Sequence, residues 1–439
     1  MKPKGFYGWW IVAASFFTFG ISTGLPYYNV AFFFDYFRDD HGWPISFITL
    51  GPPIAVLLTI WAGPFIVPRV SPRLLIIVGT GCTFGAFQWF GRLSGATWEY
   101  YAAWCLYMVG YFLAGPIPHQ VIISSWFKKK RGRAMGLTYV GVAVVGSIGN
   151  KLGPYLASQM DYTHARRWIS LIMLVAWPIA FFVLRDKPAD LGQHPDGVEP
   201  SAQPQPVERP AAVAAAVAAA APRAKSFGYL ARQSPFWLLL VGSAASIGSI
   251  AAVNFHMKFI FEAQGFVEQA ARDRIWSEAS FWVLWASIAG RLLAGWAADR
   301  FPRKYVMLIT YLVVAGAIPT LFLVTPGHTG FVYLFALVFG FAMGADYMLI
   351  PLMAADQFGL ATLSRAMSAI LPSDTIAQFW FPNLVARLRD LLAGDYIMAM
   401  MAVFGTAFLG AVAIGFLPKQ PQKDETLQVL ESGRAGTGH

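Results

Sequence analysis

Residues 276–325 read WSEASFWVLWASIAGRLLAGWAADRFPRKYVMLITYLVVAGAIPTLFLVT. Two apolar runs, at 276–297 and 305–325, flank a short turn that contains Asp299, Arg300 and three further polar or proline residues. Each run has the length of about 20 apolar residues that a helix needs to cross the hydrocarbon core of a bilayer. The stretch therefore predicts two membrane-spanning helices joined by a tight, charged turn.

The rest of the chain repeats this pattern and predicts ten more spanning helices. They cover 9–33, 46–67, 74–93, 101–125, 135–158, 168–184, 236–261, 331–355, 366–388 and 395–417. We expect an all-α membrane protein of 12 transmembrane helices in two pseudosymmetric six-helix bundles. The bundles comprise 1–184 and 236–418, joined by a largely flexible linker at 185–235 and followed by a tail at 419–439.

Composition and charge agree with this class. The chain has 439 residues, of which 56% are hydrophobic and 13% charged, and its mean hydropathy is +0.52. Soluble domains average about 25% charged residues, so an ordinary soluble enzyme, a disordered chain and a fibrous repeat are excluded. Of the 33 Lys and Arg residues, 22 fall on the side of the two termini, eight on the opposite side and three within spans. This asymmetry predicts cytoplasmic termini and explains the net charge of +10 without nucleic acid.

Comparing the two halves reveals a shared loop pattern. The second half reads GRLLAGWAADRFPRK at 290–304, and the first half reads GPFIVPRVSPR at 63–73. This resembles the signature loop of the major facilitator superfamily, complete in the second half. In the first half Pro68 stands where the pattern has an acid, so gating charge pairs are expected around Asp299 and Arg300 rather than around Pro68.

Four local motifs narrow the resemblance. They are YGWW at 7–10, HGW at 41–43, WFKKKRGRAMGL at 126–137 and KPADLG at 187–192. Together they resemble the bacterial monocarboxylate and oxalate/formate transporter group. The resemblance covers about residues 7–417 and implies a secondary active transporter in the cell inner (plasma) membrane. It would move a small organic anion by alternating access, as a monomer, with membrane lipid around it and protons as the coupling ion.

Arg291 is the first candidate for substrate binding. It lies well inside the span 276–297, where an ionised side chain is costly unless it pairs or lines water. Its planar fork suits a carboxylate, and in the resembled group an arginine in an Arg-x-x-x-Gly setting of this span binds the substrate carboxylate; Arg291 and Gly295 match that setting. The alternative is a structural pair with a neighbouring acid such as Asp346.

Asp346 is the candidate for proton coupling. Proton-coupled members of the resembled group carry an acid or amide one turn before the arginine, and here that position is Ser287. Asp346 lies near the middle of the span 331–355 and could titrate when desolvated, although a plain helix–helix hydrogen bond is an equal alternative. Its neighbour Tyr347 points to another face and is a further candidate contact for the substrate.

The first bundle supplies candidate contacts of its own. His119 lies in the span 101–125 and could touch the ligand or serve as a structural histidine. Tyr28 and Asn29 follow Pro26 midway along the first span and could line the cavity, with core packing as the alternative for the tyrosine. Lys258, near the outer end of the span 236–261, is expected to snorkel to the interface.

Lys151 and Glu278 are expected to form an outer gate. Both lie toward the outer ends of spans that face each other across the two bundles in the resembled fold, with Asp374 as an alternative partner. Charge pairs suit a gate because they are weak when wetted and stronger when water is excluded.

The residues also bear on four rival functions. An enzyme is disfavoured because no catalytic triad, metal-ligand spacing or phosphate-binding loop occurs, and neither a cofactor nor a metal site is expected. A channel fits two six-span halves around a central cation less well than alternating access does. A carboxylate antiporter of the oxalate/formate type and an exporter of larger hydrophobic compounds remain alternatives. The sequence between Arg365 and Arg387 has no second cation, which favours a monoanion over a small dianion.

Overall fold

The computed structural model describes residues 5–61, 65–198 and 226–418, and its regular structure there is entirely helical. The centre of the expected linker, at 199–225, and the expected tail at 419–439 lie outside the described residues.

The N-terminal half begins with a long bent helix. It consists of α1 (Gly8–Phe19), a π-helical turn at Gly20–Gly24, α2 (Leu25–Val30) and α3 (Phe34–His41). Pro26 has no backbone N–H to donate to the preceding turn, and such sites bend helices. The other helices of this half are α4 (Ile45–Ile48), α5 (Gly51–Thr59), α7 (Pro72–Phe90), α8 (Thr97–Ala114), α9 (Pro116–Trp126), α10 (Arg131–Gln159), α11 (Tyr162–Met173) and α12 (Ala176–Phe182).

The C-terminal half is built from longer uninterrupted helices. They are α14 (Phe227–Ala231), α15 (Ser234–Ala263), α16 (Gln269–Arg300), α17 (Arg303–Thr320), α18 (Phe331–Phe358), α19 (Leu360–Leu391) and α20 (Tyr396–Gly415). The charged turn quoted above joins α16 and α17 through only Phe301 and Pro302.

Nine helical segments among the described residues are long and apolar enough to cross a membrane. They are Gly8–His41, Pro72–Phe90, Thr97–Trp126, Tyr162–Phe182, Ser234–Ala263, Gln269–Arg300, Arg303–Leu323, Phe331–Phe358 and Tyr396–Gly415. The other three expected spans coincide with α4 and α5, with α10 and with α19, which pack against these nine but are shorter or more polar. The chain is therefore an all-α multi-pass membrane protein, and the number of twelve spans stays a prediction.

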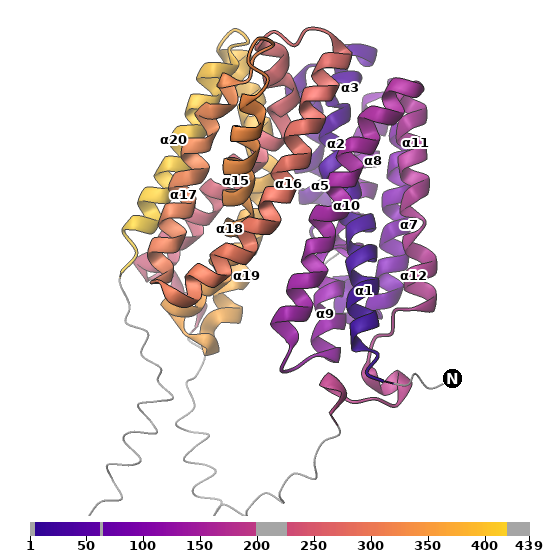
Figure 1. Cartoon of the computed structure of the whole chain (residues 1–439), viewed down its shortest axis with the longest axis vertical. Coiled ribbons are helices and arrows are strands. Elements are labelled where there is room, and N and C mark those ends of the chain that lie inside the picture. Colours follow the sequence, from indigo (N-terminus) through magenta and orange to yellow (C-terminus); the bar gives the residue numbers. More distant parts are fainter. Residues whose placement is uncertain (1–4, 62–64, 199–225, 419–439) are drawn as a thin grey trace, which may run out of the picture.

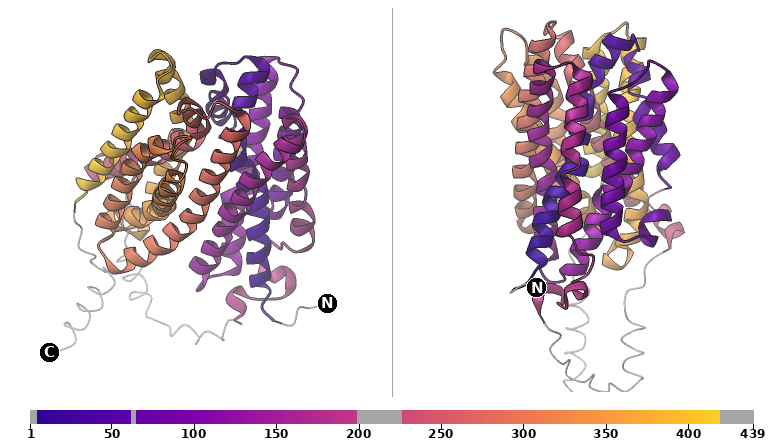
Figure 2. Two further views of the ribbon diagram at one scale, coloured as in Figure 1. Left: turned by 45° about the horizontal axis from the view of Figure 1, so that its top comes forward. Right: turned by 90° about the vertical axis from the view of Figure 1, so that its right-hand side faces the viewer.

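The two halves form two groups of helices that lie side by side (Figures 1 and 2). We call the end that carries the N-terminus and the basic turn at 128–133 the inner end, because its Lys and Arg residues predict a cytoplasmic position. The opposite end is the outer end. The halves approach each other at the outer end, and their helices diverge toward the inner end (Figure 1).

Helices α16 and α18 pack backbone to backbone through glycines. A methyl group on Gly344 would lie 1.9 Å from the carbonyl oxygen of Ser287, and one on Gly340 would lie 2.3 Å from that of Val283. Small residues permit such close approach between membrane helices. Because both helices run from the outer to the inner end, the offset of these contacts puts Asp346 at about the depth of Arg291.

A short segment after α12 closes the inner end of the N-terminal half. Asp196 accepts hydrogen bonds from the backbone N–H groups of Lys128, Lys129 and Lys130 at 3.0, 2.8 and 3.3 Å. Desolvation alone would raise the pKa of the Asp196 carboxyl, but these three donors lower it overall. The segment thereby anchors the basic turn between α9 and α10.

Candidate functional site

Arg291 lies on α16 and faces the N-terminal half. Its guanidinium interacts with the hydroxyl of Tyr28 on α2 and lies within electrostatic range of Tyr139 on α10. Its Nη1 atom is buried without a hydrogen-bond partner, and among the described residues no acid forms an ion pair with it. The alternative pair with Asp346 is thus not formed, and a guanidinium without a carboxylate faces the opposite half.

Tyrosines from both halves surround this position. The rings of Tyr27 and Tyr28 lie 5.0 Å apart, and Tyr27 and Tyr111 lie 6.1 Å apart. Tyr347 of α18 is within electrostatic range of all three and is 41% exposed. Gln378 of α19 donates a hydrogen bond to the Tyr27 hydroxyl across the halves. The surroundings of Arg291 are therefore aromatic, with several hydroxyl donors.

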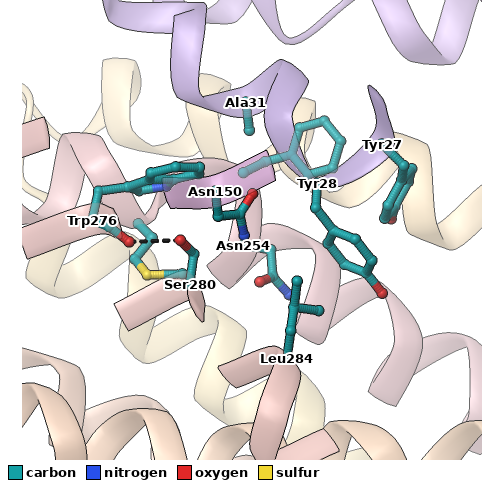
Figure 3. A pocket seen from close by; sticks show the side chains of 10 residues that line it. Tyr27, Tyr28, Ala31, Asn150, Asn254, Trp276, Ser280 and Leu284 are labelled. Atoms are coloured by element: carbon teal, nitrogen blue, oxygen red, sulfur yellow. Dashed lines mark hydrogen bonds between the residues drawn. The ribbon is translucent and has the colours of Figure 1, made fainter. Parts of the chain in front are cut away.

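A small cavity lies between the halves (Figure 3). The residues of α16 that line it precede Arg291 and therefore lie nearer the outer end. Its lining includes Tyr28 and Asn150 from the N-terminal half and Asn254, Trp276 and Ser280 from the C-terminal half. Its volume is about 20 Å³, which is the space of about one water molecule. This cavity is thus too small to admit an organic acid.

Asn29 and His119 lie in the core of the N-terminal half. Asn29 is fully buried, and its amide packs against Gly149 and Gly153 of α10 without a hydrogen-bond partner. His119 is also fully buried: Nδ1 is 2.8 Å from the carbonyl oxygen of Gly115, and Nε2 is 3.1 Å from the hydroxyl of Thr18. Both ring nitrogens therefore make hydrogen-bond contacts within the protein, as expected of a histidine with a structural role. Direct contact of Asn29 or His119 with a ligand stays a prediction.

Asp346 and Tyr347 point to different faces of α18, as expected of helix neighbours. Asp346 is fully buried within the C-terminal half, where Ser246 of α15 donates a hydrogen bond to its Oδ2 at 2.7 Å. Tyr347 turns toward the tyrosines of the N-terminal half. The helix–helix hydrogen bond of Asp346 is therefore present, and its use in proton coupling stays a prediction.

Lys151 and Glu278 meet across the halves. Lys151 Nζ of α10 donates to Glu278 Oε1 of α16 at 2.5 Å. The residues directly before them also meet, because Ser277 donates to the carbonyl oxygen of Asn150 at 2.8 Å. Asp374 does not compete for Lys151, because it accepts a hydrogen bond from Ser243 inside the C-terminal half.

The expectation that Lys258 snorkels to the interface is wrong. Only 2% of Lys258 is exposed, and its Nζ lies 2.8 Å from Asp35 of α3 and 2.6 Å from Asp273 of α16. It also donates to the carbonyl oxygen of Phe32 at 2.9 Å. The helices α3 and α15 extend beyond the expected spans, to His41 and Ala263, so Lys258 is covered by protein instead of reaching water.

Further charges continue this contact. Arg38 donates to both oxygens of Glu262 at 2.7 and 3.0 Å, and Arg272 lies 3.3 Å from Glu262 and 3.5 Å from Asp35. We call these six residues, Asp35, Arg38, Lys258, Glu262, Arg272 and Asp273, the outer cluster. Sequence reasoning missed it because Asp35 and Arg38 lie just beyond an expected span. The alternation of acids and bases at the outer ends of three helices was the available signal.

The described charges of the turn between α16 and α17, at the inner end, make no comparable contact across the halves. Asp299 and Arg300 are exposed; Arg300 lies over the ring of Trp296, 4.2 Å from its centroid, and Asp299 has no ion-pair partner among the described residues. The nearby ion pair, Arg303 with Asp356 at 2.6 Å, stays within the C-terminal half. In the part of the chain that the structure describes, the ion pairs between the halves thus lie toward the outer end, and the hydrogen bonds between the halves lie there or near the centre, as between Gln378 and Tyr27. No cluster of three or more His, Cys, Asp or Glu residues able to hold a metal occurs in that part either.

Comparison with known proteins decides the family. The family model of the major facilitator superfamily matches residues 114–382, which is more than half of the chain. The chain belongs to the major facilitator superfamily. A bacterial homolog of the human lysosomal transporter Spinster, solved in an inward-facing and unoccupied conformation, shares its fold. The TM-score is 0.58 at 14% identity over 94% of this chain and 95% of that one.

Relatives with curated names include a monocarboxylate transporter and an efflux protein. The MFS transporter asaE of Aspergillus flavus is 23% identical over 65% of this chain and 59% of its own length. Monocarboxylate transporter 12 of Xenopus laevis is 30% identical over 31% of each chain, and the agnestins efflux protein of Paecilomyces divaricatus is 25% identical over 79% of this chain and 72% of its own. The first two of these relatives are thus matched over less than two thirds of their length. This superfamily transporter resembles both a monocarboxylate carrier and an efflux protein.

Proposed function

We propose that this transporter moves a small organic anion, in the first instance a monocarboxylate, across the cell inner membrane by alternating access. Protons couple through Asp346, and the protein works as a monomer without a cofactor or nucleic acid. The observation that carries the proposal is Arg291, a partly buried guanidinium that faces the opposite half and has no acid partner among the described residues.

The chemistry of the site supports an anion. A buried cation without a partner is costly, and a carboxylate that binds its fork in a bidentate manner would offset this cost. The hydroxyls of Tyr28 and Tyr139 add donors beside it, and Tyr347 lies within electrostatic range of Tyr28. A fixed cation at this place also disfavours cationic drugs as cargo.

The experiment is uptake of a panel of labelled organic acids into proteoliposomes, preceded by a thermal-shift screen of the same acids. Arg291→Lys keeps the charge and loses the planar fork, so the variant is expected to fold and to transport poorly. Arg274→Lys, on the exposed outer part of the same helix, is the matched control and should transport as wild type. Wild-type uptake by Arg291→Lys would remove Arg291 from the site.

The aromatic surroundings of Arg291 support a second candidate, export of a larger, partly hydrophobic acid. Tyr27, Tyr28, Tyr111 and Tyr347 offer ring faces rather than further charges, and one relative is named as an efflux protein. Efflux from preloaded vesicles separates the two. Aromatic acids that outcompete lactate-sized acids in both directions would favour the larger cargo.

A further inference from the structure

Two buried carboxyl groups of the C-terminal half are held by two serines of one helix. Ser246 of α15 donates to Asp346 of α18 at 2.7 Å, and Ser243 of α15 donates to Asp374 of α19 at 2.7 Å. The two serines are at positions i and i+3 of α15, so they lie on one face of the helix with about 4.5 Å of helical rise between them. The two carboxyls therefore lie on neighbouring turns of the same surface.

Each carboxyl keeps one oxygen without a partner. Asp346 Oδ1, Asp374 Oδ2 and the hydroxyl of Tyr311 on α17 are buried, and none of the three has a hydrogen-bond partner at normal distance. Tyr311 is fully buried and lies within electrostatic range of both carboxyls, and its hydroxyl lies nearer to Asp346, with which it interacts directly. Three oxygen atoms from three helices thus lie together without a hydrogen bond of normal length, where buried polar atoms normally have one.

The site also lacks a compensating cation. No described Lys, Arg or His forms an ion pair with Asp346 or Asp374. The titratable group that faces both carboxyls is Tyr311 of α17, while α15 presents only the two serines. Tyr347 of α18 is within electrostatic range of Asp346 but points to another face of the helix. Asp346 and Asp374 lie within electrostatic range of each other, so two ionised carboxylates in this water-poor interior would repel each other, and both would be desolvated. The pair therefore requires a bound proton or another small cation.

We infer that Asp346 and Asp374 form one binding site for a monovalent cation, which the free carboxyl oxygens and the Tyr311 hydroxyl hold. The inference rests on the proposed cation-coupled transport and deepens it, because it makes Asp374 an equal member of the coupling site. The site belongs wholly to the C-terminal half, and Tyr347 follows Asp346 on α18 and faces the surroundings of Arg291. The proposed cation site on one face of α18 is thus adjacent to the proposed substrate position on another face of the same helix.

The first test needs no substrate. Infrared difference spectra of the purified full chain, recorded between acid and alkaline buffer, report the C=O stretch of protonated carboxyls. We expect a band that changes in both Asp346→Asn and Asp374→Asn and is lost in the double variant. Repeating the titration in sodium instead of choline distinguishes the proton from the sodium ion, since bound sodium suppresses the band. A spectrum that is unchanged in Asp374→Asn overturns the shared site.

The second test separates coupling from transport. Each single Asn variant should keep exchange of the acid between two equal pools and lose accumulation driven by an imposed cation gradient. The double variant should lose no more than either single one, because the two carboxyls act as a unit. Asp390→Asn, at the partly exposed outer end of α19, is the matched control and should keep both activities.

Two further results keep the outcomes distinct. Ser243→Ala removes the donor to Asp374 but keeps both carboxyls, so it should shift the infrared band even where an Asn variant fails to fold. If wild-type protein exchanges no organic acid, the proposed function fails while the infrared result still judges the site. If exchange is normal and Asp374→Asn retains wild-type accumulation, the shared site is wrong while the proposed function stands.

Discussion

Removing the Lys258 side-chain charge should open the outer end. In Lys258→Met, Asp35 and Asp273 lose the ammonium that lies 2.8 and 2.6 Å from them. The loss is costly because Asp35 is fully buried and water cannot replace the ammonium. Breaking a buried pair by deleting one partner costs about 3–5 kcal/mol. Tyr36 still donates to Asp273 and Gln269 to Asp35, so we expect the lower end of this range.

The cost falls on one conformation only. When the halves separate at the outer end, water solvates Asp35, and the penalty disappears. About 3 kcal/mol then shifts the ratio of outer-closed to outer-open molecules by roughly a hundredfold, because each 1.4 kcal/mol is a factor of ten.

The assay is labelling of a thiol at position 277 by an impermeant maleimide from the outer side, with Cys82 and Cys105 replaced. Ser277 is 6% exposed and bonds across the halves, so a cysteine there is protected while the outer end is closed. Lys258→Met should raise the labelling rate by roughly a hundredfold, with the rate of a fully exposed thiol as the upper limit. The control Lys129→Met, at an exposed position, should leave the rate unchanged.

A double variant gives a second test in the same labelling assay. If the penalty comes from an unpaired carboxylate, adding Asp35→Asn to Lys258→Met removes its main source and should slow labelling again. Equal labelling of Lys258→Met and its parent, in protein that remains folded, would refute the assignment of the outer cluster as a closing contact.

Three other predictions concern separate parts of the molecule. Glu278→Gln should raise outer-side labelling more weakly than Lys258→Met, because its side chain is 32% exposed and exposed pairs contribute about 0–1 kcal/mol. The lowered pKa of Asp196 means that its anchoring of 128–130 is present above the unfolded-state pKa and is lost as the pH falls through the folded one. Hydrogen exchange of the turn should therefore rise on acidification, and Asp196→Asn should remove this dependence. Gly344→Ala should lower the melting temperature in detergent, at a cost of at least about 1–3 kcal/mol, while Gly316→Ala, with no atom within 4 Å of the added methyl, should not.

Hydropathy predicted the class of fold and the depth of many residues. Runs of apolar residues located the helices, and the depth of Lys151 and Glu278 sufficed to place them together, because long charged side chains at equal depth on facing helices can reach each other. The glycines that bring α16 against α18 are small residues inside these apolar runs, although no contact between the two helices was predicted from them. These features depend on one helix at a time or on a pair of neighbours.

Hydropathy did not predict which face of a helix a polar residue presents. Lys258 was expected at the interface because it lies near the end of an apolar run, yet its partner Asp35 is 223 residues away along the chain. Asp374 was considered for the outer end, whereas it bonds to Ser243 within its own half. Such contacts arise from packing in three dimensions, which the apolar runs do not encode.

The positions of the charges bear on how the transport cycle is driven. Among the described residues, ion pairs join the halves at the outer end, while Asp299 and Arg300 at the inner end are exposed and unpaired across the halves. A ligand can shift this balance only by binding one conformation better than the other. On the proposed function, an anion that bridges Arg291 and Tyr28 creates a cross-half contact at the centre, and its strength depends on how closely the halves approach there. The outer cluster stabilises the outer-closed conformation, and the bridge and the bound cation must offset this stabilisation for the outer end to open. Lys258→Met should therefore raise the fraction of outer-open molecules without ligand. The further increase in that fraction when the ligand binds should be smaller than in wild type.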